Sequence, residues 1–452
     1  MKFFDTKDGG AVKQATWWVL IAGLLLTVVE GAIRKWVIGS VFEFSSYVVY
    51  FSKDLLFASL LLFPAKRGES RALDRFGRWL VPGCFLLICG AVCSMTEQIN
   101  YAGAVLTVRS LLFLPAVAFL VASRLQGISL RFVALLVGVL TVMNFGLGVM
   151  QNHMLPQDVL NRYATDTTEI STTETGVRAT GTFSYITGMG IIAVVGIWAG
   201  IVYVSLSRNV RQQMVGWGIL ACGFGCGLAS VSRGPVLIGS MMILAWIVFS
   251  GEWASTKPRS LIACVSFLVV LTYFGVTATF LKLADGLMLR AQTSSDTTQE
   301  RGLGQLDEAL LALKMAPFGN GLGTEQIGRY HYTQREMAET SFESQWARLI
   351  LETGAFGLLG FLVLCLGAIS ALETAKRETS TPGENAALFA TQLLFVGMFT
   401  TYLIFNHVAS AFTWMIFSAV LAAFVQSERS STNVMAIRAR LKSAEYTPLS
   451  DF

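Results

Sequence analysis

The sequence has few charged residues and few histidines, and it holds long runs in which neither occurs. Of its 452 residues, 14% are Asp, Glu, Lys or Arg, 54% are hydrophobic, and three are histidines. A soluble domain carries about a quarter charged residues, so this composition excludes a soluble enzyme. A membrane-spanning helix needs about 20 apolar residues. The runs therefore predict an all-α, multi-pass membrane protein in which residues 1–452 form one polytopic domain.

Several patterns that indicate metals, disulfides or processing are absent. All seven cysteines lie inside apolar runs and none in a loop, which argues against a disulfide framework or a zinc site and favours small packing residues. Asp-x-Asp and His-x-x-x-His pairs are also absent, so we expect no metal and no cofactor. Without a cleavage pattern the first run is expected to remain as an anchor. Without an internal repeat, a transporter built from duplicated halves is disfavoured.

We predict twelve transmembrane helices. They cover residues 16–36, 47–63, 79–95, 101–122, 132–151, 183–206, 215–231, 235–249, 261–281, 345–370, 386–405 and 408–425. The seventh and eighth runs are short, and only Ser232, Arg233 and Gly234 separate them. The alternative is a count of spans that differs by one such pair.

Lysine and arginine gather in alternate short loops. If the amino terminus is cytoplasmic, the inside loops hold Lys66, Arg67, Arg71, Arg75, Arg78, Arg124, Arg131, Arg208, Arg211, Lys257, Arg259, Lys376 and Arg377. The short outside loops between spans three and four and between spans eleven and twelve hold none. This asymmetry predicts two cytoplasmic termini. The net charge of +5 then reflects topology, and we expect no nucleic-acid partner.

Under this orientation, almost every ionisable side chain inside the apolar runs lies toward the outer face. The group consists of Glu30, Arg34, Lys35, Lys53, Asp54, Arg109, Arg233, Arg348 and Glu352. Charges within a membrane are expensive and usually functional. The spacing of four residues between Glu30 and Arg34, and between Arg348 and Glu352, predicts ion pairs along one helix.

Two outside loops, 152–182 and 282–344, are longer than simple connectors. Loops of this length are either functional or disordered, and the second is expected to be ordered. In the second, 305–315 is predicted to form an amphipathic helix that ends before Pro317 and lies at the outer interface. Its apolar stripe is Leu303, Leu306, Leu310 and Leu313. The glycine-rich stretch 318–324 lacks a preceding strand and a Walker lysine, so it is interpreted as a tight turn. The glycine pair Gly223 and Gly227 favours close helix packing.

Arginine is the residue best suited to bind a diphosphate, because its guanidinium group matches phosphate oxygens and stays charged. Arg233 lies at the outer end of a helix pair, and further arginines lie in the two long loops. Lys53, Asp54 and Arg109 have to find partners on other helices, on water or on a ligand. The candidate ligands for a diphosphate or glycan are Arg178, Arg233, Arg109, Lys53, Arg290 and Arg301. The alternative for the loop arginines is exposure to solvent.

Few residues are suitable as a general base. His331 lies in the second long loop, where a histidine can deprotonate a hydroxyl near neutral pH. Glu343 precedes the tenth predicted span, and there Thr340 and Glu343 also fit a capping box, in which case the carboxylate only ends the helix. Both interpretations of Glu343 stay open at this point.

Four stretches resemble the bacterial superfamily of O-antigen ligases and O-antigen polymerases. They are 178–184 (RATGTFS), 232–234 (SRG), 317–323 (PFGNGLG) and 349–357 (LILETGAFG). The amino-terminal stretches 30–36 (EGAIRKW) and 52–56 (SKDLL) are similar to a subgroup described as exopolysaccharide polymerases. The resemblance covers most of the chain.

The resemblance implies a metal-independent glycosyltransferase that acts on undecaprenyl-diphosphate-linked glycans at the periplasmic face of the bacterial inner membrane. It implies that arginines, here Arg178 and Arg233, hold the lipid diphosphate and that a loop base activates the acceptor hydroxyl. Many members have His-Asn nine residues before the Glu of Glu-x-Gly, whereas this sequence has Glu343 and Ser344. Either Glu343 is the base, which we rank first, or His331 replaces it, or the acceptor or activity differs.

We therefore expect a polymerase or ligase of exopolysaccharide or O-antigen. Its partners would be an undecaprenyl-diphosphate-linked oligosaccharide, membrane lipid and possible assembly proteins such as a chain-length regulator. A transporter or flippase is the alternative. It is disfavoured because spans five, six, eleven and twelve contain no Asp, Glu, Lys or Arg, whereas a transport path needs polar groups through the membrane. A third reading is an assembly subunit without activity.

Overall fold

The computed structural model describes fourteen stretches of the chain. Described are residues 10–38, 43–62, 70–94, 101–125, 128–163, 172–173, 176–249, 281–286, 288–289, 298–323, 342, 344–379, 381–401 and 406–424. Within these ranges the chain is almost entirely helical, with one antiparallel hairpin of two short strands, β1 (Thr172–Thr173) and β2 (Gly176–Val177). The predicted all-α class is confirmed.

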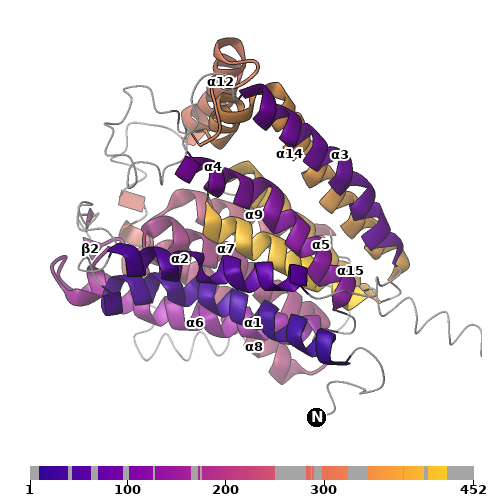
Figure 1. Cartoon of the computed structure of the whole chain (residues 1–452). Helices are drawn as coiled ribbons and strands as arrows, with labels where there is room; N and C mark the ends of the chain where they lie inside the picture. Colours follow the sequence, from indigo (N-terminus) through magenta and orange to yellow (C-terminus); the bar gives the residue numbers. More distant parts are fainter. Residues whose placement is uncertain are drawn as a thin grey trace, which may run out of the picture.

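The helices follow one another with short connections in most of the described chain (Figure 1). Those of the amino-terminal half are α1 (Gly10–Ala32), η1 (Ile33–Ile38), α2 (Glu43–Ala58), η2 (Ser59–Leu62), α3 (Arg71–Cys93), α4 (Tyr101–Val108), η4 (Arg109–Phe113), α5 (Leu114–Arg124), α6 (Leu130–His153) and η5 (Val159–Asn161). The remainder are α7 (Ile186–Leu206), α8 (Val210–Ala229), α9 (Arg233–Phe249), α12 (Thr298–Met315), α14 (Gln345–Glu378), α15 (Pro382–Thr401) and a last helix, His407–Phe424.

Seven helices in the described ranges are long and apolar enough to cross a membrane. They are Val12–Ile38, Arg71–Cys93, Gly103–Arg124, Leu130–His153, Ile186–Leu206, Gln345–Glu378 and His407–Phe424. Four other predicted spans coincide with α2, α8, α9 and α15, which are shorter or less apolar. Residues 261–280 of the ninth predicted span lie outside the described residues. The protein is thus a multi-pass membrane protein, and the total of twelve spans and their orientation stay predictions.

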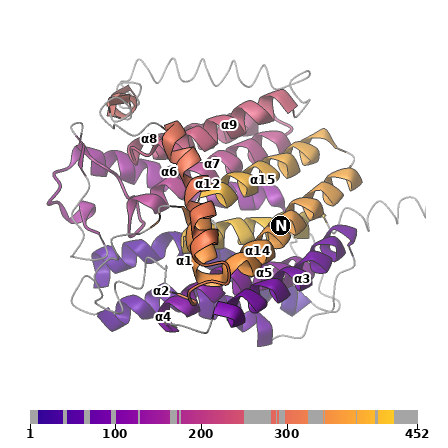
Figure 2. The ribbon, with the colours of Figure 1, turned by 90° about the horizontal axis from the view of Figure 1, so that it is seen from above.

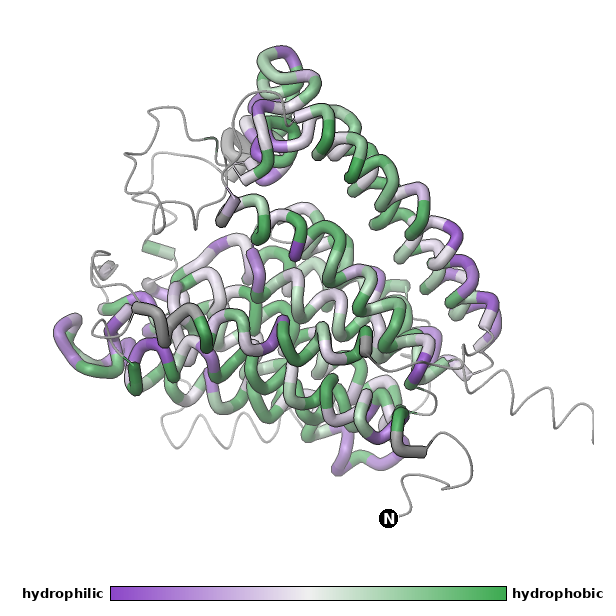
Figure 3. Tube along the Cα trace, in the orientation of Figure 1, coloured by the Kyte–Doolittle hydropathy of each residue, from purple (hydrophilic) through white to green (hydrophobic). Residues whose placement is uncertain are grey.

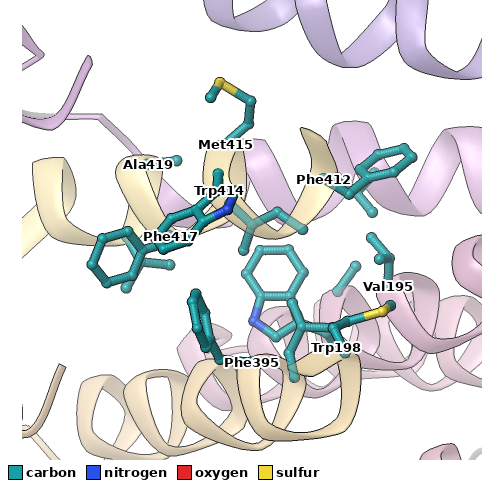
Figure 4. Close-up of a cluster of buried hydrophobic side chains, with 14 of the residues drawn as sticks. Val195, Trp198, Phe395, Phe412, Trp414, Met415, Phe417 and Ala419 are labelled. Carbon is teal, nitrogen blue, oxygen red and sulfur yellow. The ribbon is translucent and has the colours of Figure 1, made fainter. Parts of the chain in front are cut away.

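The core of the molecule surrounds α7. This helix is apolar on every side, as expected for a helix that is buried all round, and nearly all of its side chains are buried. Aromatic side chains of α15 and the last helix pack beside it (Figure 4). The ring centroids of Phe395 and Trp414 lie 5.1 Å apart, and Trp198 Nε1 donates to Thr391 Oγ1 at 3.0 Å. The indole therefore keeps a polar partner inside an apolar core.

Hydrophilic residues concentrate at the two ends of the helices, with apolar residues between them (Figure 3). One end carries β1, β2 and the start of α7, and the other carries the turn between α7 and α8 (Figure 1). Because α7 has 21 residues and a helix rises about 1.5 Å per residue, these two ends are about 30 Å apart. We call the end with β1 and β2 the hairpin end.

Helices α3 and α14 lie side by side along their length (Figures 1 and 2). Glycines allow this close approach: a Cβ at Gly90 would lie 2.5 Å from the Thr353 carbonyl oxygen, and one at Gly360 would lie 2.8 Å from the Gly83 carbonyl oxygen. Small residues at a helix interface are typical of membrane proteins, where dispersion contacts replace the hydrophobic effect.

The predicted packing role of Gly223 and Gly227 is confirmed. A Cβ at Gly223 would lie 2.8 Å from the Ile197 nitrogen of α7, and one at Gly227 would lie 3.0 Å from Val236 of α9. The seventh and eighth predicted runs are two helices, α8 and α9, because the chain turns at Ser230 and Val231.

The amphipathic helix predicted at 305–315 is α12, which begins seven residues earlier and ends at Met315 as expected before Pro317. The contact of α12 with another helix was not predicted from the sequence. Alanines of α12, together with Leu313, pack on α14, whereas Leu306 and Leu310 are 65% and 52% exposed. Small side chains bring the two helices closer than a leucine stripe would allow, so the alanine face is the one that is buried.

Candidate functional site

Two of the four motifs meet at the hairpin end. Arg178 follows β2, and its guanidinium group donates from Nε to the Ser230 carbonyl oxygen and from Nη2 to Ser232 Oγ, both at 3.1 Å. Ser232 is the residue before Arg233, the first residue of α9. Both arginines are half-buried. The fold therefore brings the two arginine motifs, 54 residues apart in sequence, into contact.

The segment 178–184 is also bound by basic side chains of η1. Lys35 Nζ donates to Thr180 Oγ1 and to the Gly181 carbonyl oxygen, both at 2.8 Å, and Arg34 Nη1 donates to Ser184 Oγ at 3.4 Å. The Lys35 side chain is buried, with 2% exposure, and no carboxylate within the described ranges lies within ion-pair distance of it. Burying a charge without a counter-ion is expensive, which makes Lys35 a candidate to face an anionic ligand.

Buried amide side chains of α6 hold the same segment from another side. Gln151 Oε1 accepts from the backbone nitrogens of Thr180 and Gly181 at 3.0 and 2.8 Å. Asn144 Oδ1 accepts from the backbone nitrogen and the hydroxyl of Thr182 at 2.9 and 3.0 Å. Polar backbone in an apolar region needs such partners, so these contacts give the segment one conformation.

A buried network of ion pairs lies next to this segment. Lys53 of α2 binds Glu30 Oε2 of α1, and His407 Nε2 lies 3.2 Å from Glu30 Oε1. Arg109 Nε of η4 lies 3.0 Å from Asp54 Oδ1 of α2. Lys53 is fully buried and Arg109 is nearly so. The expectation that Lys53, Asp54 and Arg109 find partners beyond their own helices is confirmed, with partners on other helices.

The ring of Tyr50 lies at the centre of this network. The guanidinium carbons of Arg34 and Arg109 lie 5.3 and 4.8 Å from its centroid, and Lys53 Nζ lies 4.9 Å from it. The His407 ring packs edge-on at 4.7 Å. Cations next to an aromatic face gain attraction, and more so when desolvated, so Tyr50 offsets part of the repulsion between three positive charges.

Glu30 and Glu352, each predicted to pair with an arginine on its own helix, both contact residues of other helices. Glu30 binds Lys53 and His407, which come from other helices. Glu352 of α14 accepts from Thr107 Oγ1 of α4 at 2.5 Å. Both π-helical turns, η1 and η4, contain cations of this site, in agreement with the frequent occurrence of π-helical turns at functional sites.

The other two motifs also meet. Helix α14 is interrupted at Gly354, whose φ of 65° and ψ of −166° are outside helical values. In a regular helix the Ala355 nitrogen would donate to the Leu351 carbonyl oxygen. Here Ala355 N donates to the Pro317 carbonyl oxygen at 2.9 Å, and Leu351 O accepts from Asn320 N at 2.6 Å. The glycine-rich turn thus replaces one helical hydrogen bond with two, and the predicted tight turn is confirmed.

The capping box predicted from Thr340 and Glu343 is wrong for α14. The helix begins at Gln345 with Ser344 as its N-cap, and Ser344 Oγ accepts from Ala347 N at 3.4 Å. Glu343 thus precedes the cap, where its carboxylate cannot fill the third helical position of a capping box. Glu343 is therefore not the capping-box residue of α14.

The backbone on both sides of Glu343 is bound. Arg348 Nε donates to the Phe342 carbonyl oxygen at 2.6 Å, and Ser344 N donates to Glu308 Oε2 of α12 at 2.7 Å. Residue 343 itself lies outside the described residues. Helix α12 therefore fixes the start of α14 as well as packing on it.

Several predicted site residues cannot be placed. Glu343, His331 and Arg290 lie outside the described residues, and Arg301 lies in α12 without a described side chain. Their predicted roles stay predictions. In the described part of the chain no three His, Cys, Asp or Glu side chains gather as a metal ion would require, and the metal-independent reaction likewise stays a prediction.

Four residues that we did not select as site residues hold or flank the arginine motif: Lys35, Asn144, Gln151 and His407. A polar residue in an apolar run was the available signal for Asn144 and Gln151. Lys35 belongs to the charged group expected at the outer face, and His407 is one of the three histidines of the sequence, but sequence spacing gives no means of telling which such residues face the motif.

Residues 217–362 match the family model described as O-antigen ligase. This part of the chain is similar to the O-antigen ligase family. The match runs from α8 into α14, so it includes Arg233, the turn at 317–323 and the break at Gly354, and it confirms the resemblance to the O-antigen ligase superfamily. No curated protein matches the chain.

Proposed function

We propose that this protein is an inner-membrane glycosyltransferase that moves a glycan from an undecaprenyl-diphosphate carrier to a sugar hydroxyl at the periplasmic face. The product would be a surface polysaccharide, either exopolysaccharide or O-antigen. The meeting of Arg178 with the segment that leads into Arg233, in a chain that matches the O-antigen ligase family model, is the observation that carries the proposal.

In the proposed reaction the arginines act on the leaving group. Arg178 and Arg233 bind the diphosphate, whose negative charge grows as the bond to the anomeric carbon breaks. Lys35, buried beside the same segment, adds a positive charge that has no carboxylate partner among the described residues. Preorganised cations in a site with little water stabilise such developing charge far better than solvent does.

Lys53 and Arg109 have a less direct part in this proposal. Each binds a carboxylate, Glu30 or Asp54, and breaking such a buried pair leaves an uncompensated charge at a cost of about 3–5 kcal/mol. We therefore propose that Lys53 and Arg109 hold η1 and η4 in position. The sequence alone offers Glu343 or His331 as the base that takes the proton of the acceptor hydroxyl.

Release of the lipid diphosphate tests the proposal. Purified protein in nanodiscs is given a polyprenyl-diphosphate-linked oligosaccharide and an acceptor glycan, and lipid diphosphate and elongated glycan are measured. Arg178→Ala and Arg233→Ala should each slow release about 10- to 100-fold, because hydrogen bonds to charged groups contribute about 1.5–3 kcal/mol. Arg211→Ala, exposed at the opposite end of α8, is the matched control and should be unaffected.

Two results would contradict the proposal. If both arginine variants released lipid diphosphate as fast as the wild type, neither arginine would bind the leaving group. If the wild type moved the labelled lipid-linked glycan across the bilayer and released no diphosphate, the protein would be a transporter.

A further inference from the structure

His407 and Glu30 form a pair whose geometry suits proton transfer. His407 is the first residue of the last helix, and Asn406 Oδ1 caps that helix by accepting from Val408 N and Ala409 N at 3.0 and 3.2 Å. The cap fixes the position of the histidine. Its Nε2 lies 3.2 Å from Glu30 Oε1, and its ring packs against Tyr50.

The two members of the pair differ in access to solvent. The Glu30 side chain is 3% exposed, whereas the His407 side chain is 26% exposed. Lys53 binds the second oxygen of Glu30, which favours the ionised carboxylate. An ionised, buried carboxylate accepts the Nε2 proton, fixes that tautomer and leaves the lone pair on Nδ1. In the described part of the chain no group bonds to His407 Nδ1.

The pair is connected to the segment that carries the arginine motif. Arg34 packs over the same Tyr50 ring as His407, and it donates to Ser184, the last residue of 178–184. Four charged groups face the histidine from the elements packed around it: Glu30 of α1, Arg34 of η1, Lys53 of α2 and Arg109 of η4. His407 is therefore a partly exposed, carboxylate-bound histidine beside the proposed diphosphate site.

We propose that His407, oriented by Glu30, accepts the proton of the acceptor hydroxyl. This rests on the proposed function. The hydroxyl proton moves to Nδ1 as the acceptor oxygen forms its bond to the anomeric carbon. The bond from that carbon to the diphosphate breaks, and its electron pair leaves with the lipid diphosphate. Glu30 stabilises the imidazolium, which then returns its proton to water.

His407→Gln tests the assignment, because glutamine still offers an N–H to Glu30 but has no basic nitrogen. Lipid-diphosphate release should fall about 100-fold or more in kcat, the usual contribution of a general base, with the donor KM within about twofold. His153→Gln is the matched control, since His153 is the other described histidine, lies exposed at the end of α6, and should be unaffected.

Chemical rescue separates a base from a structural residue. Added imidazole should restore part of the activity of His407→Ala, and it should not restore Arg178→Ala. The inference is overturned if His407→Gln keeps kcat within a few-fold of the wild type, or if imidazole fails to restore His407→Ala. In either case Glu343→Gln and His331→Gln, measured beside them, identify the base.

The wild-type reaction keeps this test separate from the proposed function. If the wild type releases no lipid diphosphate, the proposed function fails. If the wild type is active and His407→Gln is equally active, only the role of His407 fails.

Discussion

At the scale of single residues, the site depends on positive charges that differ in how they are neutralised. Lys53 and Arg109 have carboxylate partners. Lys35 is equally buried, yet within the described residues it donates only to a hydroxyl and a carbonyl oxygen of segment 178–184. Because a buried charge without a counter-ion opposes folding, a residue of this kind is retained where function requires it.

Lys35→Met separates stability from function. Methionine has a similar shape and removes the buried charge, so the midpoint of thermal unfolding should stay the same or rise. The affinity for the lipid-linked donor should fall about tenfold, as expected for one hydrogen-bonded charge. Both are measured on purified protein by a thermal melt and a donor titration. The control is Lys376→Met, because Lys376 lies in the last turn of α14, away from the hairpin end. Unchanged donor affinity would remove Lys35 from the site.

At the scale of elements, the interruption of α14 is the feature that joins the second long loop to the membrane helices. The turn at 317–323 satisfies the two backbone groups released at Gly354, a common requirement where a helix breaks inside a membrane protein. If α14 were a regular helix, the turn at 317–323 would lose its hydrogen bonds to Leu351 O and Ala355 N. The break is therefore a structural device that positions α12 and the start of α14.

Gly354→Ala should destabilise the protein. The φ and ψ of Gly354 belong to a region that only glycine enters readily, and such strain costs about 1–3 kcal/mol. The added Cβ would also lie 2.5 Å from the Phe318 carbonyl carbon. The midpoint of thermal unfolding should fall, whereas Gly218→Ala, with no atom within 4 Å of its Cβ, should not lower it. Equal melting of the two variants would show that the break does not need glycine.

At the scale of the whole molecule, the functional groups gather at one end. The arginine motifs, the ion-pair network and the hairpin lie at the hairpin end, whereas the exposed Arg208 lies at the other end, after α7. Transfer to a glycan at the periplasmic face requires the hairpin end to be outside, which agrees with the loop charges.

Cysteine labelling tests this orientation. In a background without the seven native cysteines, Thr172→Cys in β1 should react with a membrane-impermeant maleimide in intact spheroplasts. Arg208→Cys, between α7 and α8, should react only after lysis. Both positions are exposed, so access from one side is the only difference. The reverse pattern would place the proposed site at the cytoplasmic face.

The sequence determined the membrane class, most helix positions and the identity of the charged residues, because hydropathy and local spacing are properties of short segments. It also indicated the tight turn and the close packing at Gly223 and Gly227. It gave the wrong cap for α14, since Thr340 and Ser344 both suit an N-cap and the local pattern does not choose between them. The alanine face of α12 was missed for a related reason: its partner helix lies outside the segment.

Only the tertiary structure decided which charges meet. Glu30 lies four residues from Arg34 and 377 residues from His407, and a pattern of local spacing gives weight only to the first. The fold pairs Glu30 with Lys53 and His407, because burial forces each charge to the nearest available counter-charge, whatever its distance along the chain. For the same reason the four sequence motifs meet in two pairs, one around Arg178 and one at Gly354. Their side chains and backbone groups need hydrogen-bond partners in an apolar interior, and each pair of motifs supplies them.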